Sequence, residues 1–264
     1  MARYLHGYNN EEQQRLIDQA GFLAPLIYPS VDFSGCKKLV EIASGVGAQT
    51  AVLLRLFPDL QITSVDSSAA QLVTARENLK EFEDRVTFVC QDAQALQLKE
   101  SYDAAFICWA LEHIADPQAV MKRLRAHLLP GARIHITEVF NSSFYYKPES
   151  PALAHYYQAY NQQQIGFGGN PDVGTQLGSM LFRSGFKNVE LSRQGFHLDQ
   201  SQPEELQRVV EFWKILMRSG APGMLESGSI TQTDVDAMES DLDRIVLDEN
   251  AVFFYQFVQA KATL

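Results

Sequence analysis

Two closely spaced glycines form the first feature of the chain that could take part in chemistry. They lie in Glu41-Ile42-Ala43-Ser44-Gly45-Val46-Gly47, directly before Ala48-Gln49-Thr50. Glycine lets a backbone approach a ligand closely, and the unpaired N–H groups that open a following helix attract polar or anionic groups. A Gly-x-Gly turn on its own is equally typical of an α/β protein that needs glycine only to make the corner.

Two aspartates follow later apolar runs and favour the ligand-binding interpretation. Asp66 ends the run that starts at Ile62, and Asp92 follows Val86 to Cys90. A carboxylate after the second strand of such a fold suits the two hydroxyls of a ribose, and Asp92 could accept a hydrogen bond from an adenine amine. Helix capping by Asp66 and a turn carboxylate at Asp92 are the alternatives. The joint placement of both acids beside the glycine turn favours a nucleotide site.

The elements that must position these residues alternate between apolar strands and capped helices. Continuous apolar strands in such an alternation predict a parallel sheet with helices on both faces, which binds ligands at the carboxyl ends of its strands. The expected strands are 39–43, 62–65, 86–90, 104–109 and 134–139, and the expected helices are 48–57, a helix from Ser68 and a helix after Asp116-Pro117.

The segments outside this alternation are expected to form a lid and a cap. Asn10 is predicted to cap a helix that is bent near Gly21 and Pro25, with Gln13 completing a capping box. Residues 141–172 show no strand pattern and are interpreted as an inserted cap. The run Val252 to Val258 is expected to pair with a strand at 189–191. We therefore expect a single domain over 1–264, with a lid at 1–30 and cap or acceptor-binding segments at 141–172 and 201–247.

The residues around the glycine turn resemble those of the class I S-adenosylmethionine-dependent methyltransferases. The acidic-x-Gly-x-Gly-x-Gly motif of that family is similar to residues 41–47, with Ala43 in place of the first glycine. Asp66 matches the family's ribose-binding acid, and Gln91-Asp92-Ala93 resembles its adenine-binding segment. The stretch from Cys108 to Ile114 resembles the segment after the fourth strand in small-molecule methyltransferases, and Leu129-Pro130-Gly131-Ala132 is similar to the turn into the fifth strand.

The resemblance implies a doubly wound, seven-stranded, mostly parallel sheet of the Rossmann-like kind, with an antiparallel last strand. It implies transfer of a methyl group from S-adenosyl-L-methionine, with S-adenosyl-L-homocysteine as product, to an O, N or C atom of a small molecule. Ala43 is treated as a tolerated departure, since a methyl group there is acceptable only if the backbone avoids the left-handed region. The implied cofactor contacts are Tyr8, Glu41, Ala43, Ser44, Gly45, Gly47, Gln49, Asp66, Ser67, Gln71, Asp92, Ala93, Cys108 and Trp109.

A general base is needed only if the acceptor is protonated, and His113 is the candidate because it follows the fourth strand and imidazole titrates near neutrality. A structural histidine is the alternative, and His6 and His155 are weaker candidates. The aromatic residues of the cap favour an apolar or aromatic acceptor. Packing of these rings onto the sheet or in a homodimer interface stays open. The aromatic residues are Phe144, Tyr145, Tyr146, Tyr156, Tyr157, Tyr160 and Phe167.

Composition and charge narrow the classes of partner and function that remain open. The formal charge of −10 and the lack of a basic patch argue against nucleic acid or a membrane as partner. Cys36, Cys90 and Cys108 have no metal-ligand or pairing spacing and are expected to be buried, reduced thiols of a cytoplasmic protein without a metal. Two alternative functions stay open, a non-catalytic protein that binds the same cofactor and a nicotinamide-dependent oxidoreductase. Thr50, where the oxidoreductases have a third glycine, disfavours the second alternative.

Overall fold

A computed structural model describes residues 5–7 and 9–264, so the expected contact Tyr8 lies outside the described residues. Its seven-stranded sheet has the order β3-β2-β1-β4-β5-β7-β6, in which β7 runs antiparallel to both neighbours and the other paired strands are parallel. The expected seven-stranded, mostly parallel sheet is thus confirmed. The strands are β1 (Lys38–Ile42), β2 (Gln61–Asp66), β3 (Val86–Cys90), β4 (Tyr102–Cys108), β5 (Leu128–Lys147), β6 (Lys187–Asp199) and β7 (Val252–Thr263).

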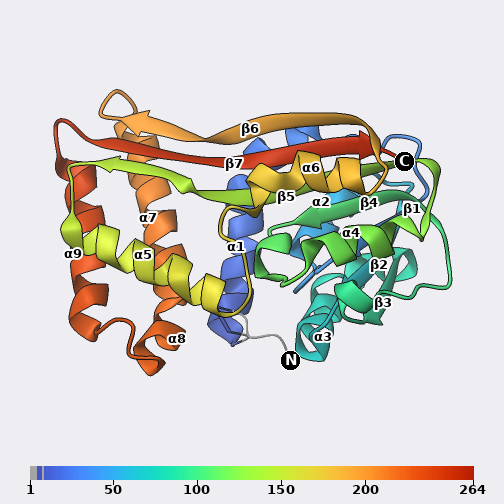
Figure 1. The fold of residues 1–264 in the computed structure, drawn as a ribbon, viewed down its shortest axis with the longest axis horizontal. Coiled ribbons are helices and arrows are strands. Elements are labelled where there is room, and N and C mark those ends of the chain that lie inside the picture. Colours follow the sequence, from blue (N-terminus) through green and yellow to red (C-terminus); the bar gives the residue numbers. More distant parts are fainter. Residues whose placement is uncertain (1–4, 8) are drawn as a thin grey trace.

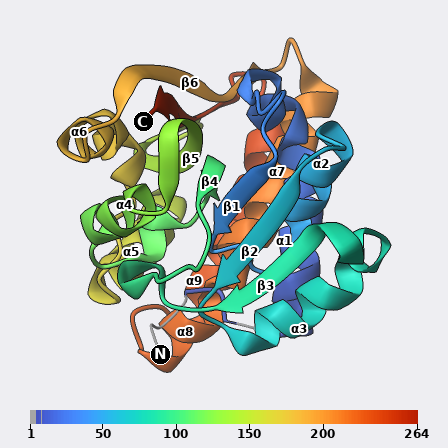
Figure 2. The ribbon, with the colours of Figure 1, turned by 90° about the vertical axis from the view of Figure 1, so that its right-hand side faces the viewer.

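Helices cover both faces of this sheet, as continuous apolar strands require. Figure 2 shows α1, α2 and α3 on one face and α4 and α6 on the other. The helices are α1 (Asn10–Ile27), α2 (Ala48–Leu56), α3 (Ala69–Asn78), α4 (Pro117–Arg125), α5 (Pro151–Gly166), α6 (Leu177–Arg183), α7 (Pro203–Ser219), α8 (Ala221–Glu226) and α9 (Gln232–Leu247).

The strands β5, β6 and β7 extend well beyond the parallel part of the sheet and carry the cap (Figure 1). The expectation that 141–172 contains no strand is wrong for its first part, because β5 runs on to Lys147 and pairs there with β7. A register shift between Phe140 and Tyr145 interrupts the regular alternation, which hides the strand in the sequence. The helices α5, α7 and α9 pack against this extension, so core and cap share one sheet.

The first helix starts one residue earlier than expected. Asn9 is the N-cap, and its side chain accepts a hydrogen bond from the backbone N–H of Glu12. Gln13 does not complete a capping box but reaches α3, where its side chain bonds to Gln71 and Thr74. Helix α1 also continues through Pro25 to Ile27. The N-terminal segment is therefore a docked helix that bridges other elements.

One hydrophobic cluster runs from the core into the cap. It joins Leu39 of β1 and Leu53 of α2 to Tyr156 of α5, Trp213 of α7 and Leu242 of α9, all of which are buried. A second cluster fills the opposite face between the sheet and helices α4 and α6. Apolar burial stabilises a fold roughly in proportion to area. The continuous cluster therefore holds the cap helices in place above the strand ends.

The expectation of three buried thiols is correct only for Cys36, because Cys90 is exposed and Cys108 is half-buried. Cys90 ends β3, near the edge of the sheet, where no helix covers it fully. None of the helices in the described ranges is both long and apolar enough to span a membrane.

Candidate cofactor cradle and acceptor pocket

The glycine turn between β1 and α2 consists of left-handed backbone positions. Ala43, Gly45 and Gly47 have φ angles of 54°, 55° and 77°. A Cβ on Gly47 would lie 2.6 Å from Leu79 Cδ1, so this position requires glycine for space as well as for its φ angle. The expectation that Ala43 avoids the left-handed region is therefore wrong, and the residue is exposed at the surface of the turn. The turn thus accepts alanine only with backbone strain.

Glu41 lies behind the turn and stabilises the junction between β1 and α2. Its side chain is buried and accepts a hydrogen bond of 2.5 Å from Thr50 Oγ1. Burial, with the charge of Asp66 nearby, raises the pKa of Glu41 to about 8. A carboxyl group with a pKa in this range is mainly protonated at neutral pH. The Glu41 side chain therefore stabilises the turn through a buried hydrogen bond to Thr50 of α2.

Asp66 closes the other side of the turn. One carboxylate oxygen accepts from the backbone N–H of Gly45 and the other from that of Ser68, each at 2.8 Å. Burial raises the pKa of Asp66, although these backbone donors oppose the shift. The acid thus connects the carboxyl ends of β1 and β2. We call Gly45, Gly47, Asp66 and the turn between β1 and α2 the cofactor cradle.

Several other expected contact residues lie around this cradle with partners of their own. Ser44 is buried and accepts from Ser64 Oγ at 2.6 Å, and Gln49 accepts from the Tyr28 hydroxyl. Gln71 is buried and bonded to Gln13 of α1 at 3.0 Å. Helix α1 therefore covers one side of the cradle.

The adenine-side candidates are more exposed. Asp92 is exposed and accepts from the backbone N–H of Gln94 at 2.8 Å, so it performs the turn role that the sequence left as an alternative. Its neighbour Ala93 is buried, whereas Ser67 is exposed. These residues border the carboxyl ends of β2 and β3, the edge where the sequence predicted them.

The turn after β4 has an uncommon conformation that a buried acid supports. Trp109 has φ 55°, a left-handed value that is rare for a bulky residue. Glu138 of β5 is fully buried, and one of its oxygens accepts from the backbone N–H groups of Ala110 at 2.9 Å and Leu111 at 2.7 Å. Burial and the charge of Glu112 raise the pKa of Glu138. Glu138 thus holds the segment that presents Trp109 and His113.

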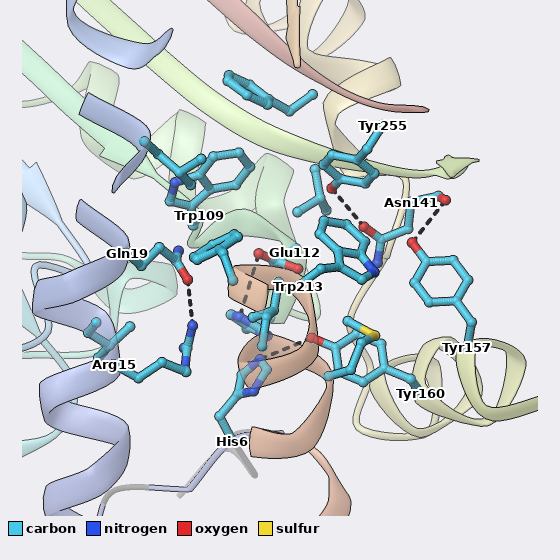
Figure 3. A pocket seen from close by; sticks show the side chains of 18 of the residues that line it. His6, Arg15, Gln19, Trp109, Glu112, Asn141, Tyr157, Tyr160, Trp213 and Tyr255 are labelled. Carbon is cyan, nitrogen blue, oxygen red and sulfur yellow. Dashed lines mark hydrogen bonds and ion pairs between the residues drawn. The ribbon is translucent and has the colours of Figure 1, made fainter. Parts of the chain in front are cut away.

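A pocket of about 70 Å³ opens beside this turn, between the core and the cap. Figure 3 shows Arg15 and Gln19 of α1 on one side and Tyr157 and Tyr160 of α5 on the other. The remaining side chains come from the segment before α1, from α1 and α7, from β5, β6 and β7, and from the turn after β4. They are His6, Leu16, Leu23, Trp109, Glu112, His113, Val139, Asn141, Phe196, Phe212, Trp213, Leu216, Met217, Tyr255 and Phe257.

Two histidines lie at the polar end of the pocket, with their ring centroids 6.2 Å apart. His6 Nε2 is 3.1 Å from the Tyr160 hydroxyl and its Nδ1 is 2.6 Å from Ser219 Oγ. His113 Nε2 is 3.7 Å from Glu112 Oε1, and Gln164 bonds to Glu112 Oε2 at 2.7 Å. Burial lowers the pKa of both histidines. Neutral imidazoles are able to take a proton from a bound molecule.

The structure separates the three histidine candidates. His6 and His113 line the pocket, whereas His155 is exposed and its Nε2 is 4.0 Å from Asp234. Of the aromatic cap residues, Tyr157 and Tyr160 line the pocket, but Tyr145 is 52% exposed.

Sequence reasoning missed Arg15, Gln19, Asn141 and the β7 aromatics, because polar residues on a helix and aromatic residues in a strand carry no signal of a pocket. Groups of three or more side chains able to hold a metal are absent from residues 5–7 and 9–264.

Comparisons with known proteins agree with this geometry. Residues 40–134 match the family model of a methyltransferase domain. Malonyl-[acyl-carrier protein] O-methyltransferase of Bacillus cereus is 34% identical over 93 residues, which are 34% of this chain and 33% of that protein. Trans-aconitate 2-methyltransferase of Paracidovorax citrulli is 31% identical over 134 residues, half of each chain.

A solved structure extends the similarity to the whole fold. It is Haemonchus contortus phosphoethanolamine N-methyltransferase 2 in complex with S-adenosyl-L-methionine, with a TM-score of 0.61 and 18% identity over 99% of this chain and 58% of that one. The chain matches about one third of the length of the B. cereus relative. The matched residues include β1, the glycine turn, β2 and the turn after β4. Residues 40–134 are therefore similar to a methyltransferase domain, on a fold that the chain shares with a solved S-adenosyl-L-methionine-bound methyltransferase.

Proposed function

We propose that the protein transfers a methyl group from S-adenosyl-L-methionine to a small-molecule acceptor. The observation that carries this proposal is the adjacency of the cradle and the pocket. The cradle lies at the ends of β1 and β2, the pocket begins after β4, and β1 and β4 are neighbours in the sheet. Strand order reverses between β1 and β4, which is where sheets of this class bind their ligands.

The cradle residues fit the proposed cofactor. Asp66 retains lone pairs for a ribose diol beside the two backbone bonds that it accepts. The exposed turn at Ala43 and the half-buried Gly45 leave the backbone open to a ligand. S-adenosyl-L-methionine supplies an electrophilic methyl group on a sulfonium, whose thioether is already a good leaving group. The protein therefore has mainly to align the reactants and to exclude water.

The pocket supplies the groups that an acceptor with a removable proton would need. His113 is the proposed base, since burial keeps its imidazole neutral in the range where it must accept a proton. Glu112 Oε1, 3.7 Å from His113 Nε2, stabilises the imidazolium that this transfer forms. Gln164 holds Glu112 in place through its 2.7 Å bond. The surrounding aromatic side chains keep water away from the reacting atoms.

A nicotinamide-dependent oxidoreductase is less consistent with these features. Thr50 is fully buried and bonded to Glu41, so the turn has no third glycine to receive a dinucleotide pyrophosphate. The antiparallel β7 also lies between β5 and β6, where the dinucleotide-binding fold has a parallel order. A non-catalytic protein that binds the same cofactor would share the cradle with a methyltransferase and would lack only an acceptor in the pocket. The cytoplasmic location stays a prediction from the sequence, and a homodimer interface stays an open alternative.

Calorimetric titration tests the cofactor, and labelled methyl transfer tests the reaction. We expect S-adenosyl-L-homocysteine to bind and NAD and NADP not to bind. Incubation with methyl-labelled S-adenosyl-L-methionine and a metabolite extract should then yield a labelled small molecule. Binding of NAD alone would overturn the proposal. Binding of S-adenosyl-L-homocysteine without transfer to any compound of the extract would favour the non-catalytic alternative.

A further inference from the structure

The pocket contains both tryptophans of the chain, and their indole N–H groups are unused. Trp109 and Trp213 line the pocket, and the Nε1 atoms of both are buried without a hydrogen-bond partner among the described residues. Trp213 as a whole is only 3% exposed. Buried N–H groups without partners are rare, because leaving one unpaired costs free energy. Figure 3 shows Trp109 on the side of Gln19 and Trp213 on the side of Asn141 and Tyr157.

The other buried polar side chains at this end of the pocket already have partners within the protein. Asn141 Nδ2 donates to Asn161 at 2.8 Å, and Asn141 Oδ1 accepts from the Tyr255 hydroxyl at 3.0 Å. The Tyr157 hydroxyl donates to the Asn141 carbonyl at 3.0 Å. An indole nitrogen can only donate. A molecule that completes the pocket must therefore bring atoms that accept hydrogen bonds.

The walls of the pocket favour a flat, apolar body between these donors. Trp109 packs edge-on against Phe257 with centroids 4.9 Å apart, and Trp213 lies 4.5 Å from the Tyr255 ring. Leu216 and Met217 complete the apolar surface. Aromatic faces and edges stack well with planar ligands. The two neutral histidines lie at the opposite, polar end, where a hydroxyl group of the ligand would be deprotonated.

We infer that the acceptor is a hydroxylated aromatic compound whose carbonyl oxygens accept hydrogen bonds from the indole N–H groups of Trp109 and Trp213. This inference rests on the proposed function, because it assigns the pocket to the methyl acceptor. The hydroxyl group of the compound points toward His113, and its carbonyl oxygens face the indole N–H groups. An ammonium compound fits poorly, since it would bring only donors to groups that themselves donate.

The presence of only two tryptophans makes a direct test possible in the unaltered protein. With tryptophan labelled by ¹⁵N in the indole ring, the spectrum contains two indole N–H resonances, both from the pocket. The protein is first saturated with S-adenosyl-L-homocysteine, and the probes are then added. The probes are 4-hydroxyacetophenone and 6-acetyl-2-naphthol, their carbonyl-free counterparts 4-ethylphenol and 6-ethyl-2-naphthol, and the cation tyramine.

We expect the better-fitting acetyl compound to bind about tenfold more tightly than its ethyl counterpart, as one added hydrogen bond implies. It should move the proton resonance of the indole to which its carbonyl binds downfield, and the ethyl compound should move neither. Equal binding of the members of both pairs, unmoved indole resonances, tightest binding of tyramine, or no binding of any probe would each overturn the inference. A downfield shift of Trp109 by S-adenosyl-L-homocysteine alone would overturn its assignment to the acceptor.

Trp213→Phe and Trp109→Phe keep a ring and remove the N–H group. Each variant assigns one resonance, and the variant that lacks the indole whose resonance moves should lose the acetyl preference, while the other variant retains it. If a variant fails to fold, the measurement on the unaltered protein still decides the question. Failure of the proposed function would appear separately, as a lack of S-adenosyl-L-homocysteine binding in the first step.

Discussion

Ala43 occupies a backbone position that favours glycine. Its φ angle of 54° costs a residue with a Cβ about 1–2 kcal/mol. We therefore expect Ala43→Gly to raise the free energy of unfolding by about 0.5–1 kcal/mol, as measured by chemical denaturation. Ala51→Gly, in the regular helix α2, is the matched control and should lower it by a similar amount. A destabilised Ala43→Gly variant would show that the alanine methyl makes a compensating contact.

Asp66 is the residue on which the proposed ribose contact depends. Removal of two hydrogen bonds to a charged group by Asp66→Ala should weaken S-adenosyl-L-homocysteine binding roughly 100-fold or more in calorimetry. Asp66→Asn retains one oxygen, which can accept from the N–H group of Gly45 but not also from that of Ser68, so it measures the contribution of the second oxygen to binding. The control is Asp59→Ala, because Asp59 is an exposed ion-pair partner of Lys37. This variant should bind S-adenosyl-L-homocysteine as tightly as the unaltered protein. Unchanged affinity in Asp66→Ala would place the ribose elsewhere.

His113 tests the acid–base part of the proposal. His113→Asn should lower kcat by about 10²–10⁴-fold on an acceptor hydroxyl, with cofactor affinity retained. Burial lowers the pKa of this imidazole, so the acidic limb of the kcat profile should lie below the ordinary histidine pKa of 6.5. The control His155→Asn removes an exposed ring outside the pocket and should leave kcat unchanged. Full turnover in His113→Asn would return the residue to a structural role.

At the scale of elements, the sequence predicts the parallel core well and the cap poorly. The runs at Leu39, Ile62 and Ala104 are continuous and apolar because both faces of their strands are covered, which makes them visible without knowledge of the fold. Residues 141–147 are a strand only because β7 pairs with them from more than a hundred residues away. Such a non-local pairing leaves little trace in a local pattern.

The two parts of the site also differ in how well the sequence predicts them: the cradle well and the pocket poorly. The cradle lies in one short loop plus one strand end, so its residues are near one another in the sequence. The pocket combines α1, α5, α7 and the ends of β5 and β7. In the sequence, Arg15 and Gln19 are typical of the solvent-facing surface of a helix. Only the docking of α1 against the cap places them in the pocket. No local property of Trp213 indicates that its N–H group lacks a partner.

The junction of β1 and α2 should make stability depend on pH through Glu41. Its folded pKa of about 8 exceeds the ordinary value of 4.5, so the native state keeps a proton that the unfolded state releases. The free energy of unfolding contributed by this group is therefore highest below pH 4.5 and decreases as pH rises to 8. Glu41→Gln should be more stable than the unaltered protein by about 1–3 kcal/mol at pH 8.

Denaturation at a series of pH values measures this difference. The gap between Glu41→Gln and the unaltered protein should widen between pH 4.5 and pH 8, while Thr50 still has an oxygen to which it can donate. Glu83→Gln, at an exposed site, is the control for the substitution itself. A pH-independent gap for Glu41→Gln would mean that the native carboxyl is ionised throughout this range.

At the scale of the whole molecule, α1 connects the two halves of the site. Leu16 Cδ1 lies 3.9 Å from the place of a Cβ on Gly45, and Gln13 bonds to Gln71 beside the cradle. Arg15, Gln19 and Leu23 of the same helix line the pocket. One helix therefore covers both the proposed cofactor and the proposed acceptor. Opening of this helix would admit a large cofactor to both parts of the site, so we predict that α1 is the gate.

Hydrogen exchange of the ligand-free, S-adenosyl-L-homocysteine-bound and ternary states tests this prediction. We expect α1 amides to exchange more slowly with S-adenosyl-L-homocysteine and slowest in the ternary state, because each ligand stabilises the closed form. The strand at 145–147 should be protected in all three states by its pairing with 252–254 of β7. The central strand β1 is the internal control. Equal protection of α1 with and without ligand would make it a fixed wall, and the cofactor would then have to enter past the exposed residues at the ends of β2 and β3.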